Sequence, residues 1–154
     1  MKKYRIYCDS SVIGGYFDSE FESDSQRFID AVKEGHIVML ISEVVVEEIL
    51  NAPKNVRDLL NSIPPTFVER VPISNEVIEL RNAYISAGIL GVKWIDDATH
   101  VAAATLARAD AIVSWNFSHI VRLDKMKAYN QVNLLNGYGI ITIITPKEVS
   151  YDND

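Results

Sequence analysis

The stretch IVMLISEVVVEEI, residues 37–49, decides the fold class of this chain. Residues 37–41 form a continuous apolar run, short enough for a strand that is buried within a parallel sheet. Ser42 then predicts the start of a helix that carries Glu47 and Glu48. A buried strand that leads directly into a helix is the unit from which α/β folds are built.

The same order of strand and helix continues on both sides of this stretch. Further strands are predicted at residues 4–8, 66–73, 111–115 and 140–144, and further helices at 26–35, 55–63, 74–88, 98–109 and 120–135. The run 66–73 alternates poorly, so we place it at an edge of the sheet. The alternation predicts a layered α/β fold with a mostly parallel central sheet. We expect one domain over residues 1–154, because no linker, repeat or low-complexity segment divides the chain.

The composition is that of an ordinary soluble globular protein, with 154 residues of which 48% are hydrophobic and 23% charged. Fifteen basic against 21 acidic residues give a net charge of −6, which argues against binding nucleic acid by bulk positive charge. Local basic groups such as Lys54 and Arg57 are candidates for a groove, although an exposed helix face is the simpler interpretation. No apolar stretch is long enough for a signal peptide or a membrane span. The single cysteine, Cys8, cannot form an internal disulfide, so we expect a cytoplasmic protein.

Oxygen-bearing side chains follow several predicted strands, at the edge where open α/β sheets bind their ligands. Asp9 follows the first strand, Glu48 lies in the helix after the second, Asp97 begins a helix, and Asn116 follows a strand. Two carboxylates about 4 Å apart repel by roughly 4 kcal/mol at an effective dielectric constant near 20, so the cluster needs a proton or a cation. Oxygen ligands alone favour Mg²⁺ or Mn²⁺ over zinc.

Each of these residues also has a simpler structural explanation when it is taken singly. Asp9 is then a turn residue, Asp96 or Asp97 a helix cap, and Glu47 or Glu48 part of an exposed helix face. We assign Asp96 as the cap and Glu47 as the exposed member of its pair. Independent caps and turns need not all fall at one sheet edge, so the joint arrangement favours a site.

Histidines and aromatic residues give weaker signals. His100 lies three residues after Asp97, and this spacing alone would suggest zinc. No cysteine or second histidine joins the pair, so we expect a buried, hydrogen-bonded His100, and the same for His119. Trp115 and Tyr16 are candidates for stacking on an RNA base, with a place in the core as the simpler interpretation.

Four segments resemble the PIN-domain family, and in particular its VapC-type toxin ribonucleases of toxin–antitoxin systems. They are YCDSSV (7–12), ISEVVVEEI (41–49), DATHVAAA (97–104) and AIVSWNF (111–117), and the tail from residue 136 to residue 148 resembles endings in one branch of that family. The segments span nearly the whole chain, and their order and spacing are more specific than any one of them.

The resemblance implies a PIN-like three-layer fold that hydrolyses RNA phosphodiester bonds with Mg²⁺ or Mn²⁺. It assigns catalysis and metal binding to Asp9, Glu48, Asp97 and Asn116, with Glu48 as a ligand or as the base that orients water. The second acid of the family lies six residues after a serine, which selects Glu48. The fourth position is usually Asp, and Asn116 removes one charge, which should weaken metal binding. Alternatively, the Asn116 amide donates a hydrogen bond to a neighbour such as Asp97.

The resemblance also implies partners: an RNA substrate, an antitoxin protein that enters the acidic groove and a second copy in a homodimer, with no membrane partner. Two other classes stay open. A catalytically weakened PIN-like domain that acts as an RNA- or protein-binding module would explain Asn116. A metal-dependent phosphatase or phospho-acceptor domain also carries an Asp after its first strand, although Ser11 stands where a phosphatase has its second Asp.

Overall fold

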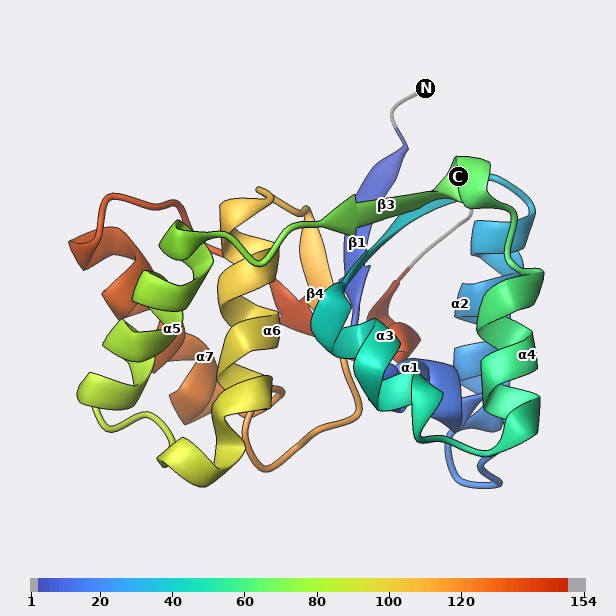
Figure 1. Ribbon diagram of the computed structural model, residues 1–154, viewed down its shortest axis with the longest axis horizontal. Coiled ribbons are helices and arrows are strands. Elements are labelled where there is room, and N and C mark those ends of the chain that lie inside the picture. The colour runs from blue at the N-terminus through green and yellow to red at the C-terminus, as the bar shows by residue number, and fades with distance from the viewer. Residues whose placement is uncertain (1–2, 150–154) are drawn as a thin grey trace.

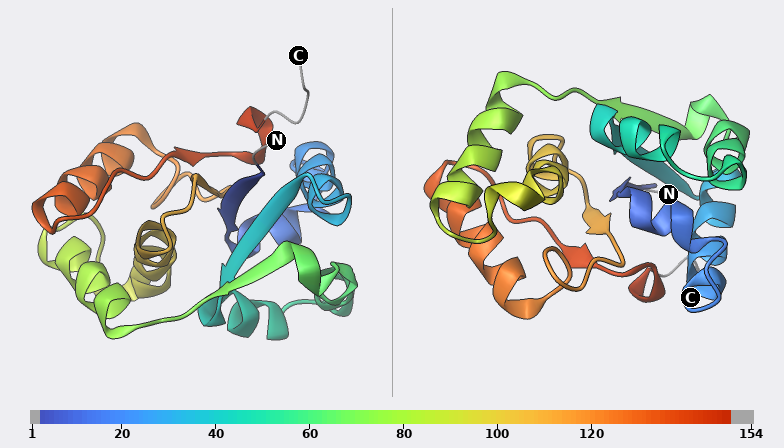
Figure 2. Two further views of the ribbon diagram at one scale, coloured as in Figure 1. Left: turned by 90° about the horizontal axis from the view of Figure 1, so that it is seen from above. Right: turned by 60° about the horizontal axis from the view of Figure 1, so that its bottom comes forward.

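The computed structural model describes residues 3–149 and consists of a central parallel sheet with helices on both faces (Figures 1 and 2). The strands are β1 (Tyr4–Cys8), β2 (Ile37–Ser42), β3 (Val68–Val71), β4 (Ala111–Val113) and β5 (Ile143–Ile144). Their spatial order is β3-β2-β1-β4-β5, and every pair is parallel. The expected three-layer α/β fold is confirmed, and β3 lies at an edge as its sequence predicts.

Helices connect the strands in the predicted order. They are α1 (Ser10–Gly15), α2 (Glu22–Lys33), α3 (Glu43–Leu50), α4 (Lys54–Ser62), α5 (Asn75–Ser86), α6 (Ile95–Leu106) and α7 (Leu123–Leu135), with 3₁₀ turns at Pro65–Phe67, Val92–Trp94 and Pro146–Glu148. The apolar face of α2 buries Phe28, Ile29 and Val32 in the core. The chain then reverses at Gly35, whose φ of +81° favours glycine over other residues.

Helix α6 is slim because its buried face is made of small side chains. Ala98, Ala102, Ala103 and Ala104 are fully buried. A helix with such a face can lie close to a sheet, and α6 lies beside β2 and β4. This close approach brings the first turn of α6 next to the carboxyl ends of the strands (Figure 2).

The structure corrects several predicted boundaries. Residues 10–15 form helix α1, because the carboxylate of Asp9 caps it by accepting the backbone N–H of Ser11. Strand β4 ends at Val113 and α7 begins only at Leu123, because a hydrogen-bonded turn at Asn116 interrupts the chain between them. Residues 1–2 and 150–154 of the expected domain lie outside the described part. Within that part, no helix is both long and apolar enough to cross a membrane.

Candidate functional site

The carboxyl ends of β1, β2 and β4 meet at one edge of the sheet, which faces forward in the right-hand view of Figure 2. Helices α1, α3 and α6 begin at this edge. Three predicted site residues, Glu48, Asp97 and Asn116, line one cavity there of about 430 Å³. The cavity is completed by Lys93, Trp94, Asp96, Ser118 and His119. The fourth predicted residue, Asp9, is only 4% exposed and interacts electrostatically with Glu48 and Asp97.

Asp9 is held by two serines. Its Oδ1 accepts hydrogen bonds from the Ser11 backbone N–H at 3.1 Å and the Ser11 hydroxyl at 2.6 Å, and its Oδ2 accepts from the Ser114 hydroxyl at 2.5 Å. Burial raises the pKa of Asp9; the His100 charge and the serine hydrogen bonds lower it, and the Glu48 charge raises it further. The net shift is upward, because burial makes the charged form of this carboxylate costly.

Glu48 is positioned by a chain of buried hydrogen bonds. Its Oε1 lies 2.7 Å from His100 Nε2, and His100 Nδ1 lies 2.8 Å from the Tyr7 hydroxyl. That hydroxyl lies 2.7 Å from the Ser42 hydroxyl. The expectation of a buried, hydrogen-bonded His100 is confirmed, with 1% of the residue exposed. The Ser42 side chain makes no capping bond to α3, although Ser42 is the residue before that helix.

The carboxylates around His100 determine its charge. Burial lowers the pKa of His100, but the hydrogen bond that its ring donates to Glu48 and the charges of Asp9, Glu48 and Asp97 raise it by more. The net shift is upward, so the protonated ring is favoured. A positive ring under the acidic edge offsets part of the carboxylate repulsion.

Asp97 lies in the first turn of α6 and is partly buried. Burial raises the pKa of Asp97. The pKa is lowered by the charges of His100 and His119 and by a hydrogen bond from the Asn116 side chain, and the charge of Asp9 raises it again. The net shift is upward. The prediction that Asp96 caps the helix is wrong. The helix begins two residues earlier than a cap at Asp96 would place it, directly after Trp94, so Asp96 lies exposed within the first turn and makes no cap.

The Asn116 side chain is used by its own loop. Its Oδ1 accepts hydrogen bonds from the backbone N–H groups of Ser118 at 3.1 Å and His119 at 2.9 Å. Its side chain also makes a hydrogen bond to the Asp97 carboxylate, which lowers the pKa of that group. This arrangement agrees with the alternative in which the amide of Asn116 contacts Asp97. A role as metal ligand would require the same oxygen to serve both the loop and the ion.

The donor set suits a hard cation, while the side chains are not gathered around one point. Over residues 3–149, no three His, Cys, Asp or Glu side chains are arranged to hold a metal ion. The two carboxylates with raised pKa values, Asp9 and Asp97, nevertheless supply oxygen ligands and negative charge that a divalent cation would neutralise. The residues therefore fit Mg²⁺ or Mn²⁺ by their chemistry.

The histidine and aromatic predictions had mixed outcomes. The Nδ1 of His119 is buried and has no hydrogen-bond partner in the described part of the chain, so that prediction is wrong. Trp115 stacks on Phe21 at a centroid distance of 4.5 Å and donates to the Ser25 hydroxyl at 2.8 Å, which places it within packed structure. The tryptophan that lines the acidic cavity is Trp94, which is exposed and which no sequence motif indicated.

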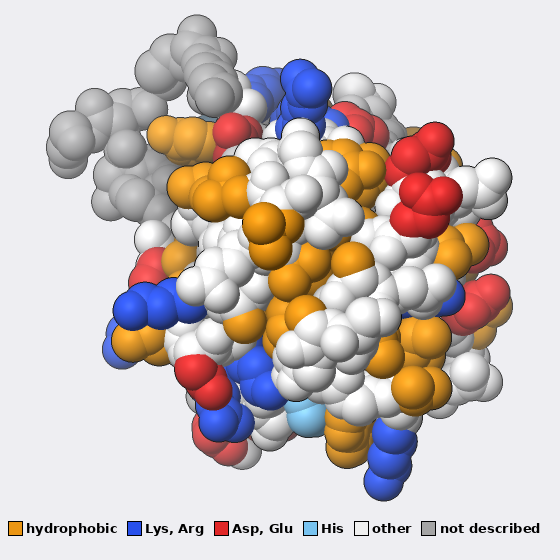
Figure 3. Space-filling model, turned by 90° about the vertical axis from the view of Figure 1, so that its left-hand side faces the viewer, with side chains coloured by type: hydrophobic (Ala, Val, Ile, Leu, Met, Phe, Trp, Pro, Cys, Tyr) orange, Lys and Arg blue, Asp and Glu red, His pale blue; other side chains and the backbone are white. Residues whose placement is uncertain are grey.

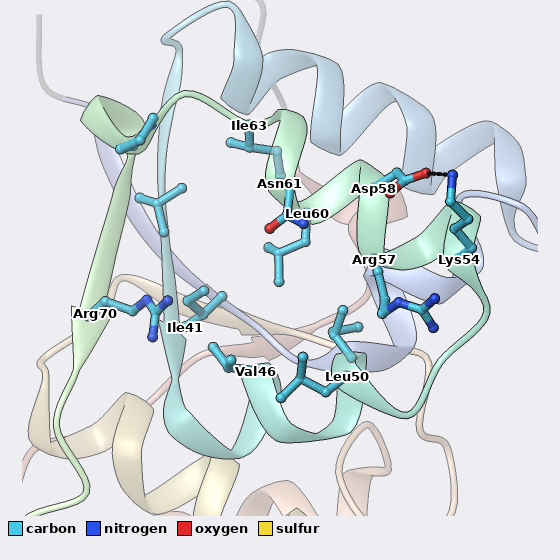
Figure 4. A pocket seen from close by; sticks show the side chains of 13 residues that line it. Ile41, Val46, Leu50, Lys54, Arg57, Asp58, Leu60, Asn61, Ile63 and Arg70 are labelled. Carbon is cyan, nitrogen blue, oxygen red and sulfur yellow. Dashed lines mark hydrogen bonds and ion pairs between the residues drawn. The ribbon is translucent and has the colours of Figure 1, made fainter.

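A second cavity, of about 560 Å³, lies between α3, α4, β2 and β3 and holds none of the predicted site residues (Figure 4). Apolar side chains such as Val46 and Leu50 line it. Arg57 and Arg70 approach it from opposite sides, and Lys54 pairs with Asp58 at 3.2 Å. Lys54 and Arg57, the basic groups that the sequence suggested for a groove, thus line a cavity that contains none of the predicted site residues.

Comparisons with known proteins support the fold. No family model matches the chain, and no curated protein matches its sequence. The crystal structure of FitAcB from Neisseria gonorrhoeae is similar with a TM-score of 0.60 and 12% identity, covering 94% of this chain and 99% of that one. Tyrosyl-tRNA synthetase from Aeropyrum pernix gives a TM-score of 0.48 and 11% identity, covering 92% of this chain and 52% of that one. At such low identity, the likeness to FitAcB shows a shared fold alone.

Proposed function

We propose that this chain is a PIN-like, metal-dependent endoribonuclease of the VapC type. The observation that carries the proposal is the convergence of Glu48, Asp97 and Asn116 on one cavity beside the buried Asp9. Burial raises the pKa values of Asp9 and Asp97, so their charged forms are unfavourable unless a cation neutralises them. The position at the carboxyl edge of a parallel sheet is where such folds bind their ligands.

Each side chain has a distinct role in this proposal. Asp9 and Asp97 would hold the cation, and a bound divalent ion would supply activation of water and neutralisation of charge on the scissile phosphate. Ser11 and Ser114 fix the orientation of the Asp9 carboxylate. Glu48, held by His100, is the ligand or base that orients water.

The test is cleavage of labelled RNA with Mg²⁺ or Mn²⁺, with and without EDTA. We expect EDTA to abolish cleavage, and Asp9→Asn or Asp97→Asn to reduce it at least about a hundredfold, since the site loses one charged ligand. Asp58→Asn is the matched control, because Asp58 lies at the second cavity and pairs with Lys54. Activity that survives EDTA or Asp9→Asn would contradict the proposal.

A second candidate function is an RNA- or protein-binding module with weakened catalysis. It is favoured by Asn116, whose oxygen already accepts two hydrogen bonds within its loop. This candidate predicts binding of RNA or a partner protein without cleavage at any concentration of Mg²⁺ or Mn²⁺. The same cleavage assay, run beside a binding assay, therefore separates the two functions.

We also propose partners on the basis of the PIN-domain resemblance: an antitoxin whose basic segment enters the acidic cavity, and a second copy of this chain. The face formed by α5 and α7 carries apolar side chains among polar ones (Figure 3). At the end of α7, Leu134 is 61% and Leu135 is 85% exposed. Light scattering should show a dimer, and Leu135→Asp should weaken it if this face is buried in it. A strict monomer at high concentration would contradict the dimer.

A further inference from the structure

Exposed aromatic side chains surround the candidate site. Trp94 is 41% exposed and lines the acidic cavity. Phe117, which follows Asn116 in its loop, is 51% exposed. Phe17 is 43% exposed and lines a neighbouring cavity that also contains Glu48. Large apolar rings are costly to leave in water, so this concentration at one edge indicates a surface that binds flat, partly apolar groups.

Trp94 connects the two segments that carry Asp97 and Asn116. It ends the 3₁₀ turn Val92–Trp94, directly before α6 and three residues before Asp97. Its indole stacks on the His119 ring with a centroid distance of 4.4 Å and an interplanar angle of 29°. His119 in turn donates its backbone N–H to Asn116 Oδ1. The stacked pair is therefore fixed relative to the carboxylates.

Lys93 supplies a positive charge at the same place. Its ammonium lies 5.1 Å from the centroid of the Trp94 ring, and the residue is exposed and lines the cavity. A cation–π contact at an exposed site is weaker than the stacking of a nucleobase on an aromatic ring. A base that stacks on the indole would therefore displace the ammonium. The displaced ammonium stays beside the nucleotide, where it can contact a phosphate.

We propose that Trp94, backed by His119, binds an unpaired base of the RNA substrate, with Lys93 on a neighbouring phosphate. The inference rests on the proposed function and adds a preference for single-stranded RNA. A base inside a duplex is already stacked on both neighbours, so it offers no free face to the indole. Single-strand binding combines stacking with local positive charge, and in a chain with a net charge of −6 Lys93 supplies that charge at the cavity.

The test is binding of a short fluorescein-labelled single-stranded RNA, followed by anisotropy in EDTA and again in Mg²⁺ at low temperature. We expect Trp94→Ala to weaken binding about tenfold, the loss of one stacked base. Trp94→Phe should keep most of the affinity, because it keeps an aromatic face. Tyr4→Ala is the matched control: Tyr4 is 53% exposed, but it lies at the start of β1, at the opposite edge of the sheet. Thermal melting checks that each variant folds.

The outcomes separate this inference from the proposed function. Equal affinity of the parent and Trp94→Ala, or the same loss with duplex RNA, overturns the base-binding site even if cleavage is normal. A parent that does not bind RNA in either buffer also overturns it. If the parent binds and Trp94→Ala weakens binding, but no metal supports cleavage, the base-binding site stands and the nuclease function fails.

Discussion

The replacement Asn116→Asp tests how negative charge is balanced at the acidic edge. The Oδ1 of the new side chain can still accept the two loop N–H groups, but its second oxygen replaces an amide that acts on Asp97 through a hydrogen bond. At about 4 Å two carboxylates repel by roughly 4 kcal/mol at an effective dielectric constant of 20, and by about half as much where water reaches both groups. Both residues are partly exposed, so we expect a loss of about 2 kcal/mol in the free energy of unfolding.

The assay is thermal unfolding in EDTA and in Mn²⁺, with titration calorimetry for the affinity. For a chain of this size, about 2 kcal/mol lowers the melting temperature in EDTA by about 4–8 °C. Mn²⁺ should restore it, because a cation converts the repulsion into an additional ligand. Asn75→Asp is the control, since it adds the same charge at the exposed first turn of α5. If the Asn116→Asp variant is as stable as the parent in EDTA and binds Mn²⁺ no more tightly, the reasoning about this position is refuted.

Three further predictions concern stability. His100→Ala should lower the free energy of unfolding in urea by about 2–4 kcal/mol, because it leaves a cavity and removes one hydrogen-bond partner each from Tyr7 and Glu48. An unchanged urea midpoint would contradict this account of the buried hydrogen bonds. In EDTA, the free energy of unfolding should fall as pH rises from 5 to 8. The pKa of His100 is raised above 6.5 in the folded protein, so the stability that its protonation contributes is complete below pH 6.5 and is lost as pH rises through the folded pKa. Urea titrations that show stability rising over this range would refute the prediction. Gly15→Ala should lower the free energy of unfolding by about 1–3 kcal/mol, because the new Cβ would lie 2.7 Å from the Ser25 hydroxyl oxygen and 3.0 Å from Trp115 Nε1. A melting temperature equal to that of the parent would contradict this, since it would show that the contact relaxes freely.

The sequence by itself determined the elements and their layers. β-favouring residues predict β1, a continuous apolar run predicts β2, and helical spacing ending in glycine predicts α2. These signals act between residues that are close along the chain. The parallel arrangement followed from the alternation of strands and helices. It also placed Asp9, Glu48 and Asp97 at one sheet edge, since the ends of parallel strands coincide. The boundaries near Asn116 were wrong because a side-chain hydrogen bond forms the turn there.

Only the tertiary structure decided what these residues contact. Glu48 and His100 are 52 positions apart, so their hydrogen bond exists only once α3 and α6 meet beside β2. Burial, which the sequence does not measure, raises the pKa values of Asp9 and Asp97. The exposure of the two tryptophans also depends on the tertiary structure. Phe21 packs against Trp115 and covers it, while Trp94 reaches the cavity, because exposure depends on which distant segments pack over a side chain.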